Sequence, residues 1–133
     1  MTDPFRHHPE LRSLVKPCGE SFFRTITTEK IKAQIAASGQ ALTIEFHDDD
    51  TREGLRAEAL EGHDGDLYVF AYGSLMWDPA LEFTEVRRAF APGHERRFIL
   101  VDDKGGRGNS QAPGVMAALD LGQGCDGLVF KIA

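Results

Sequence analysis

The chain has 133 residues, enough for one domain with a sizeable core, and its hydrophobic fraction of 41% and charged fraction of 27% are typical of soluble globular proteins. A formal net charge of −6 argues against nucleic acids and anionic membranes as partners. Two distant cysteines argue against a disulfide framework or a zinc site, and there is no apolar run of about 18 residues to span a membrane. Because the N-terminus is polar and unlike a signal peptide, we expect a cytoplasmic protein.

Residues 1–66 are predicted to form a polar, helical N-terminal extension. Thr27 or Thr28 can cap a helix that begins near Glu29, where the acidic side chain is favourably placed in the first turn. Gly39 is a plausible end for this helix, because glycine readily adopts the left-handed conformation that follows a last helical turn.

A second helix is predicted in the same half of the chain. Asp50 is followed three residues later by Glu53, a spacing that resembles a capping box. The helix should end near Gly62, and residues 63–66 are typical of a turn.

From residue 67 onward, strand-like segments dominate. The predicted strands are residues 67–71, 86–91, 94–101, 115–120 and 127–132. Pro92-Gly93 is a turn signal, residues 102–114 are predicted to form a loop rich in small and polar residues, and residues 121–124 connect the last two strands. Cys125 is expected to be a small buried side chain. With the helices gathered at one end of the chain, the fold class predicted is α+β.

The most informative motif is the turn Tyr72-Gly73-Ser74-Leu75, which follows the first strand and is called the 72–75 turn below. A buried strand that ends in a small Gly-Ser turn brings backbone N–H groups to the rim of a sheet. Such groups can bind a carboxylate or an oxyanion, and Gly73 is expected to permit this close approach and to adopt a positive φ. A conventional serine nucleophile is not indicated, because Ser74 lacks the G-x-S-x-G pattern.

This turn resembles the YGSL signature of the gamma-glutamylcyclotransferase superfamily, and its flanks, Trp77-Asp78-Pro79 and residues 83–89, resemble the ChaC branch. Two later segments strengthen the resemblance: residues 105–115, where Asn109 replaces the usual Thr, and residues 124–130. The resemblance covers residues 67–133. It implies a gamma-glutamylcyclotransferase-like domain with a mixed-sheet barrel core, which we expect to be truncated because the chain stops in an apolar strand.

The resemblance implies an enzyme that degrades glutathione by cyclising its γ-glutamyl group to 5-oxoproline and releasing cysteinylglycine, with no cofactor, as a monomer. The substrate-binding residues that it predicts are Val69, Phe70, Ala71, Tyr72, Gly73, Ser74, Leu75 and Arg107. The family's general base is a glutamate beyond the strand that ends here at Ala133. No catalytic residue is therefore assigned within this chain, and the 133 residues alone are expected to be inactive.

Several alternatives remain at this stage. Arg107 can hold a substrate carboxylate or can pair with Asp102 or Asp103 in a surface loop. The arginine pairs at 87–88 and 96–97 are expected on solvated strand faces, and the five histidines show no metal spacing. The carboxylates of residues 82, 85, 102 and 103 are assigned no role. Alternative functions are a non-catalytic γ-glutamyl-binding module and a cyclotransferase for other γ-glutamyl amines.

Overall fold

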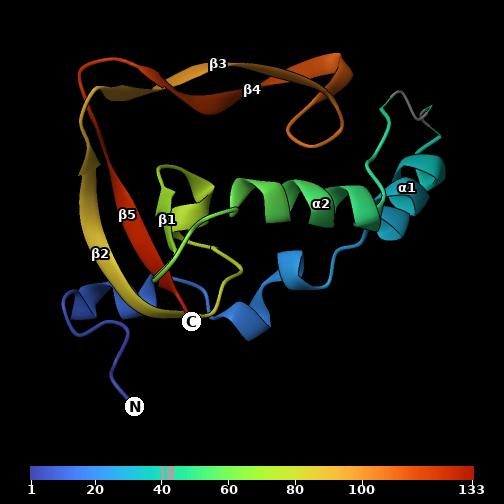
Figure 1. The fold of residues 1–133 in the computed structure, drawn as a ribbon. Helices are drawn as coiled ribbons and strands as arrows, with labels where there is room; N and C mark the ends of the chain where they lie inside the picture. Colours follow the sequence, from blue (N-terminus) through green and yellow to red (C-terminus); the bar gives the residue numbers. More distant parts are fainter. Residues whose placement is uncertain (40, 42–43) are drawn as a thin grey trace. The chain divides into compact units, whose positions relative to one another are not determined.

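The structure, a computed structural model, describes residues 1–39, 41 and 44–133. These residues divide into two compact units, one made of residues 1–25 and 66–133 and the other of residues 26–65. Helices α1 and α2 lie in the second unit, and strands β1 to β5 lie in the first (Figure 1). The predicted α+β class is confirmed. No described helix is long and apolar enough to cross a membrane.

In the unit of residues 26–65, α1 spans Thr28–Ala37. Of the two caps considered, Thr27 is the one used: its hydroxyl accepts a hydrogen bond from the backbone N–H of Lys30 at 3.2 Å. Gly39 follows the helix with a φ of 75°, as predicted for its end.

Helix α2 spans Asp49–Ala59, and its cap differs from the prediction. Asp48, rather than Asp50, is the N-cap, and its carboxylate accepts the Thr51 N–H at 2.7 Å. Three consecutive aspartates occur here, and the first of them lies just before the helix, where its side chain can accept a hydrogen bond from an otherwise unpaired N–H group of the first turn. The other two fall in the first turn, where negative charge is also favourable.

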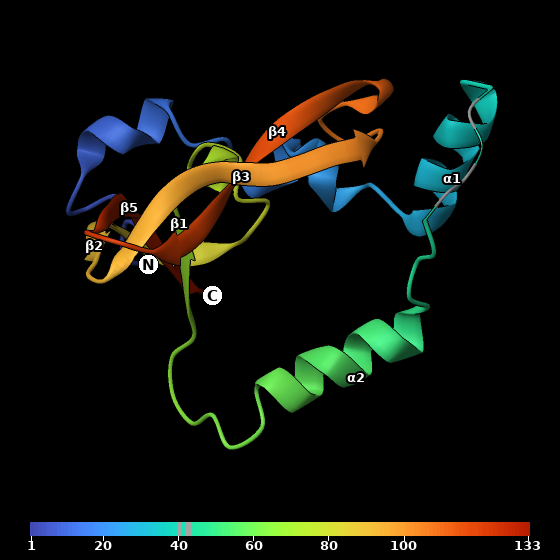
Figure 2. The same ribbon diagram turned by 90° about the horizontal axis from the view of Figure 1, so that it is seen from above.

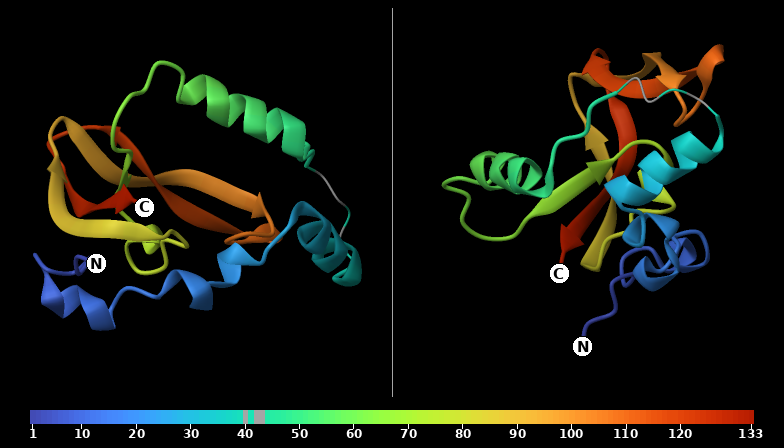
Figure 3. Two further views of the ribbon diagram at one scale, coloured as in Figure 1. Left: turned by 60° about the horizontal axis from the view of Figure 1, so that its bottom comes forward. Right: turned by 90° about the vertical axis from the view of Figure 1, so that its right-hand side faces the viewer.

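The first 25 residues form three short 3-10 helices, Pro9–Ser13, Cys18–Glu20 and Phe22–Arg24. They pack with residues 66–133, and Leu11 and Val15 are buried in that unit's core. The same segment runs beside β2 (Figure 3), where the carbonyl of Pro4 accepts the Val86 N–H at 3.1 Å. Residues 1–25 thus complete the core of this unit, whereas the helices of residues 26–65 lie outside it.

The core lies on a three-stranded antiparallel sheet in the order β1-β5-β2, formed by β1 (Tyr68–Ala71), β5 (Cys125–Ile132) and β2 (Phe83–Ala91). Its buried hydrophobic residues are Leu11, Val15, Ala71, Val86, Leu128 and Phe130. Phe130 is fully buried and meets the Phe83 ring edge-on, with centroids 4.9 Å apart. Cys125 is buried, as predicted.

Strands β3 (His94–Lys104) and β4 (Asn109–Leu121) form a second, two-stranded antiparallel sheet and run side by side (Figure 2). The predicted loop over residues 102–114 is wrong in extent, because only residues 105–108 lie outside the strands. The flanking residues pair across the hairpin, Asp102 with Gly114 and Lys104 with Asn109. Cross-strand pairing overrides the small and polar composition that suggested a loop.

Both sheets meet at a corner that depends on glycine. Strand β2 continues into β3 through Pro92-Gly93, while β4 continues into β5 beside it, and the Gly122 N–H donates to the Gly93 carbonyl at 3.1 Å. Gly93 has a φ of 73°, and a Cβ on Gly124 would lie 2.2 Å from the Phe90 ring. A two-stranded ribbon therefore bends from one sheet into the other. All pairings among the described residues are antiparallel and form no closed barrel, so the expected mixed-sheet barrel is not found in them.

Candidate functional site

The 72–75 turn leaves the end of β1 and enters a short 3-10 helix, Ser74–Met76, with Gly73 as its N-cap. The Gly73 carbonyl accepts the Met76 N–H at 2.9 Å, which fixes the turn. Gly73 has a φ of −143°, so the positive φ expected for this glycine is wrong. A Cβ at Gly73 would also have no heavy atom of the protein within 4 Å. The glycine is therefore required neither by backbone conformation nor by packing, and it lines a pocket.

That pocket has a volume of about 420 Å³ and lies within the size range of small-molecule sites. Its lining combines β1, the turn, the hairpin and the loop at its tip: Phe70, Ala71, Tyr72, Gly73, Ser74, Leu75, Arg96, Phe98, Arg107, Val115, Met116 and Ala117. The structure thus brings together every predicted substrate-binding residue except Val69. Val69 lies earlier on β1, opposite Phe130 of β5.

Arg107 extends from the loop at the hairpin tip towards the turn. Its Nη2 donates to the Ser74 hydroxyl at 3.2 Å. Asp102 instead organises the loop, because its carboxylate accepts the backbone N–H groups of Lys104, at 2.9 Å, and of Arg107. These backbone hydrogen bonds, that of Lys104 first, lower the pKa of Asp102. Asp103 pairs with Lys104, so the guanidinium of Arg107 makes no ion pair with either of the two nearby aspartates in the described residues.

Arg96 is a pocket residue that the sequence analysis missed. It is exposed, as expected for a solvated strand face, but its Nη1 also donates to the Tyr72 carbonyl at 2.8 Å and it lines the pocket. Its neighbour Arg97 does fit the expectation and pairs with Glu95 at 2.9 Å. Strand alternation places these two arginines on opposite faces of β3. The alternation therefore predicts that only one of them shares a face with Glu95, but it does not predict what the other one contacts.

An apolar wall from the hairpin completes the pocket and was also not predicted. Phe98, Val115, Met116 and Ala117 belong to β3 and β4. Phe98 is 69% exposed, and Val115 is 59% exposed, so this wall is open on one side. Phe70 and Tyr72 also line the pocket, and their rings stack with centroids 6.4 Å apart. Apolar surface around a few converging polar groups is the usual composition of a ligand site.

Comparison with known proteins identifies the family. The sequence model of the family described as ChaC-like protein matches residues 67–133, about half of the chain. The chain belongs to the ChaC-like family. The match includes the 72–75 turn, the whole of β2 to β5 and both pocket arginines.

Curated relatives of this ChaC-like chain share its second half. It is 42% identical over 74 residues to the glutathione-specific gamma-glutamylcyclotransferase of Escherichia coli (strain K12), a match that covers 56% of this chain and 32% of the relative. It is 36% identical over 75 residues to glutathione-specific gamma-glutamylcyclotransferase 1 of Homo sapiens, covering 53% and 33%. The chain therefore spans about a third of the length of these relatives. No solved structure matches it.

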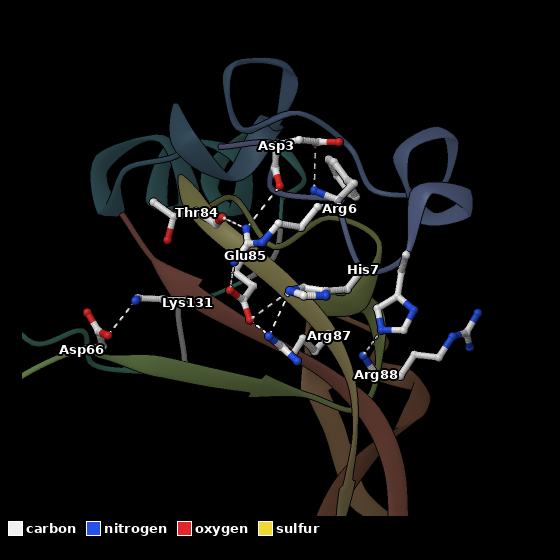
Figure 4. Close-up of polar contacts among 11 residues, drawn as sticks. Asp3, Arg6, His7, Asp66, Thr84, Glu85, Arg87, Arg88 and Lys131 are labelled. Carbon is white, nitrogen blue, oxygen red and sulfur yellow. Dashed lines mark hydrogen bonds and ion pairs between the residues drawn. The ribbon is translucent and has the colours of Figure 1, made fainter. Parts of the chain in front are cut away.

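The acidic side chains of the ChaC-like chain lie outside the pocket, as none of the lining residues carries a carboxylate. Glu85 on β2 is the most enclosed by cations, pairing with Arg87 and Arg6 and lying 3.8 Å from His7 Nε2 (Figure 4). The hydrogen bond from Arg87 is the main cause of its lowered pKa, and Arg6 adds to it. Arg6 also donates to the Thr84 carbonyl at 3.2 Å. Glu85 thus joins the N-terminal segment to β2 as a fixed anion.

Metal binding finds no support in side-chain grouping. No three histidine, cysteine, aspartate or glutamate side chains gather as metal ligands within residues 1–39, 41 and 44–133. The polar groups that face the pocket are instead the two guanidinium groups, the Ser74 hydroxyl and the backbone of the turn. This set can bind an anion and orient it, but it contains no group able to accept a proton at neutral pH.

Proposed function

We propose that this chain binds the γ-glutamyl end of glutathione, and that the protein to which it belongs converts glutathione to 5-oxoproline and cysteinylglycine. The observation that carries the proposal is the pocket that joins the 72–75 turn with Arg107, in a chain of the ChaC-like family. The substrate-binding residues proposed are those predicted from the sequence, with Val69 acting through β1 rather than by contact.

The proposed reaction is an intramolecular aminolysis. The α-amine of the glutamyl group attacks the carbon of its own γ-amide, the new C–N bond closes a five-membered lactam, and the bond to cysteinylglycine breaks. One proton leaves the attacking amine and one joins the departing amine. Folding the glutamyl group into attack geometry is worth several kcal/mol. Backbone N–H groups of the turn are suited to the oxyanion that develops on the amide oxygen.

The general base is proposed to lie outside residues 1–133. A base that works at neutral pH needs a raised pKa. Of the four carboxylates considered in the sequence, at residues 82, 85, 102 and 103, none lines the pocket, and Glu85 and Asp102 have lowered pKa values. The missing base favours one alternative for the 133 residues alone, namely a module that binds γ-glutamyl compounds without converting them to products. The mixed-sheet barrel, the monomeric state, the cytoplasmic location and the lack of a cofactor are likewise proposals for the whole protein.

Residues 1–133 and the full-length protein should be compared with glutathione as substrate, by detecting 5-oxoproline and cysteinylglycine. We expect the short chain to bind glutathione but to react slower by about 10²–10⁴-fold, the usual effect of losing a general base. Equal turnover by both would place the base within residues 1–133. A full-length protein that prefers γ-glutamyl amines would support the second cyclotransferase specificity, and one that binds glutathione without products would support the binding module.

A further inference from the structure

Two arginines of the pocket differ from the arginines around them. Arg87, Arg88 and Arg97 pair with Glu85, Glu10 and Glu95 respectively. The guanidinium groups of Arg96 and Arg107 make no ion pair with any described carboxylate. Each instead donates one hydrogen bond to an uncharged oxygen of the 72–75 turn, Arg96 to the Tyr72 carbonyl and Arg107 to the Ser74 hydroxyl.

Each of these guanidinium groups retains capacity for an anion. A guanidinium carries five N–H donors in a planar fork that matches a carboxylate, and a single bond to a neutral oxygen uses one of them. The two groups reach adjacent parts of one turn from distant parts of the hairpin, because Arg96 pairs with Leu119 near its base while Arg107 lies in the loop at its tip. Both arginines line the same pocket, which is therefore suited to a ligand with two carboxylates.

We propose that Arg96 binds the second carboxylate of the substrate, the one at the glycyl end of glutathione, and so selects γ-glutamyl peptides with a free terminal acid over γ-glutamyl amines. This inference rests on the proposed function. Arg107 meets the hydroxyl of Ser74, within the turn whose N–H groups receive the glutamyl end. Arg96 meets the carbonyl of Tyr72, the first residue of the turn, and extends from the strand that carries Phe98 of the apolar wall. The cysteinyl part of the peptide then lies against that wall, between the two arginines.

The test is a cycle that changes the ligand and the residue separately. Binding of glutathione, and of glutathione with its glycyl carboxylate amidated, is measured by titration calorimetry with residues 1–133. Wild type and Arg97→Met, the matched control on the other face of β3, should bind the amide about 5- to 10-fold more weakly than glutathione, the effect of one exposed charge-assisted hydrogen-bond pair. Arg96→Met should reduce this ratio to about 2-fold or less. Arg96→Lys keeps the cation and should retain part of the ratio, and circular dichroism checks that each variant is folded.

Three results would overturn the assignment. If Arg96→Met weakens both ligands equally, Arg96 only positions the turn through the Tyr72 carbonyl. If Arg107→Met, rather than Arg96→Met, removes the discrimination, the two carboxylates bind the other way round. If wild type binds glutathione and its amide equally well, the pocket has no second carboxylate site, although the proposed function stands. Wild type that binds neither ligand contradicts the proposed function itself, and the role of Arg96 with it.

Discussion

Replacing Gly73 by alanine separates the binding role of the 72–75 turn from its folding role. Gly73 lines the pocket, its φ of −143° is outside the left-handed region, and a Cβ would have no protein atom within 4 Å. The added methyl group therefore occupies pocket space without disturbing the fold. It blocks the close approach of a ligand oxygen to the backbone N–H groups of the turn.

The expected magnitude follows from one lost hydrogen bond to an ionised group. Such a bond is worth about 1.5–3 kcal/mol, so the affinity for glutathione should fall by about 10- to 150-fold. Stability should move the other way. A glycine-to-alanine change at a compatible backbone position stabilises by about 0.4–1 kcal/mol, because it restricts the unfolded chain. A variant that is slightly more stable and binds far more weakly is the distinctive result.

The assay combines calorimetric titration of glutathione with thermal unfolding, for wild type, Gly73→Ala, Gly73→Val and Gly19→Ala. Gly19 is the matched control, because it also lacks a positive φ and a Cβ there would also meet nothing within 4 Å, yet it lies outside the pocket. Gly19→Ala should keep wild-type affinity, and Gly73→Val should bind no better than Gly73→Ala. Unchanged affinity in Gly73→Val, with the fold intact, would refute binding by the backbone of the turn.

Three further predictions concern the loop, a strained residue and the core. Asp102→Ala should loosen residues 105–108 and weaken glutathione binding by about 2- to 10-fold. In the wild type, the pKa of Asp102 in the folded state is lowered from its ordinary 3.8, so its carboxylate stabilises the loop fully above pH 3.8 and loses this effect as the pH falls through the lowered pKa. The NMR chemical shift of the Arg107 amide, which donates to this carboxylate, should report the loss. Ala80 has a φ of 53°, so Ala80→Gly should stabilise by about 0.5–1 kcal/mol in denaturant unfolding, and a loss of stability would contradict the strain. Phe130→Ala should lower the free energy of unfolding by about 3–5 kcal/mol, because the ring is fully buried. Phe98→Ala, in the exposed wall of the pocket, should weaken glutathione binding with little change in stability. Equal losses of stability in the two variants would contradict the assignment of Phe130 to the core and Phe98 to the pocket.

Local patterns in the sequence were sufficient for the elements and for the turn. Threonine before a helical stretch predicted the cap of α1, and the apolar run before Tyr72 predicted β1, because helix caps and apolar strand runs depend on neighbouring residues. The run did not predict burial, since only Ala71 of β1 is buried. The same local reasoning failed where partners are distant. The extent of the 105–108 loop depends on cross-strand pairing of β3 with β4, and the choice of Asp48 over Asp50 depends on where the first helical turn closes.

The sequence by itself determined the α+β class, the 72–75 turn, Arg107 as a candidate ligand for a carboxylate, and the resemblance that the family comparison confirmed. Tertiary structure alone decided that Arg96 and the apolar wall share the pocket with that turn, and that residues 1–25 complete the core. Arg96 and Tyr72 are separated by 24 positions in the chain, and a sequence pattern carries no information on which strand face meets which turn. That information arises only when the ribbon bends at Gly93 and brings the hairpin over the end of β1.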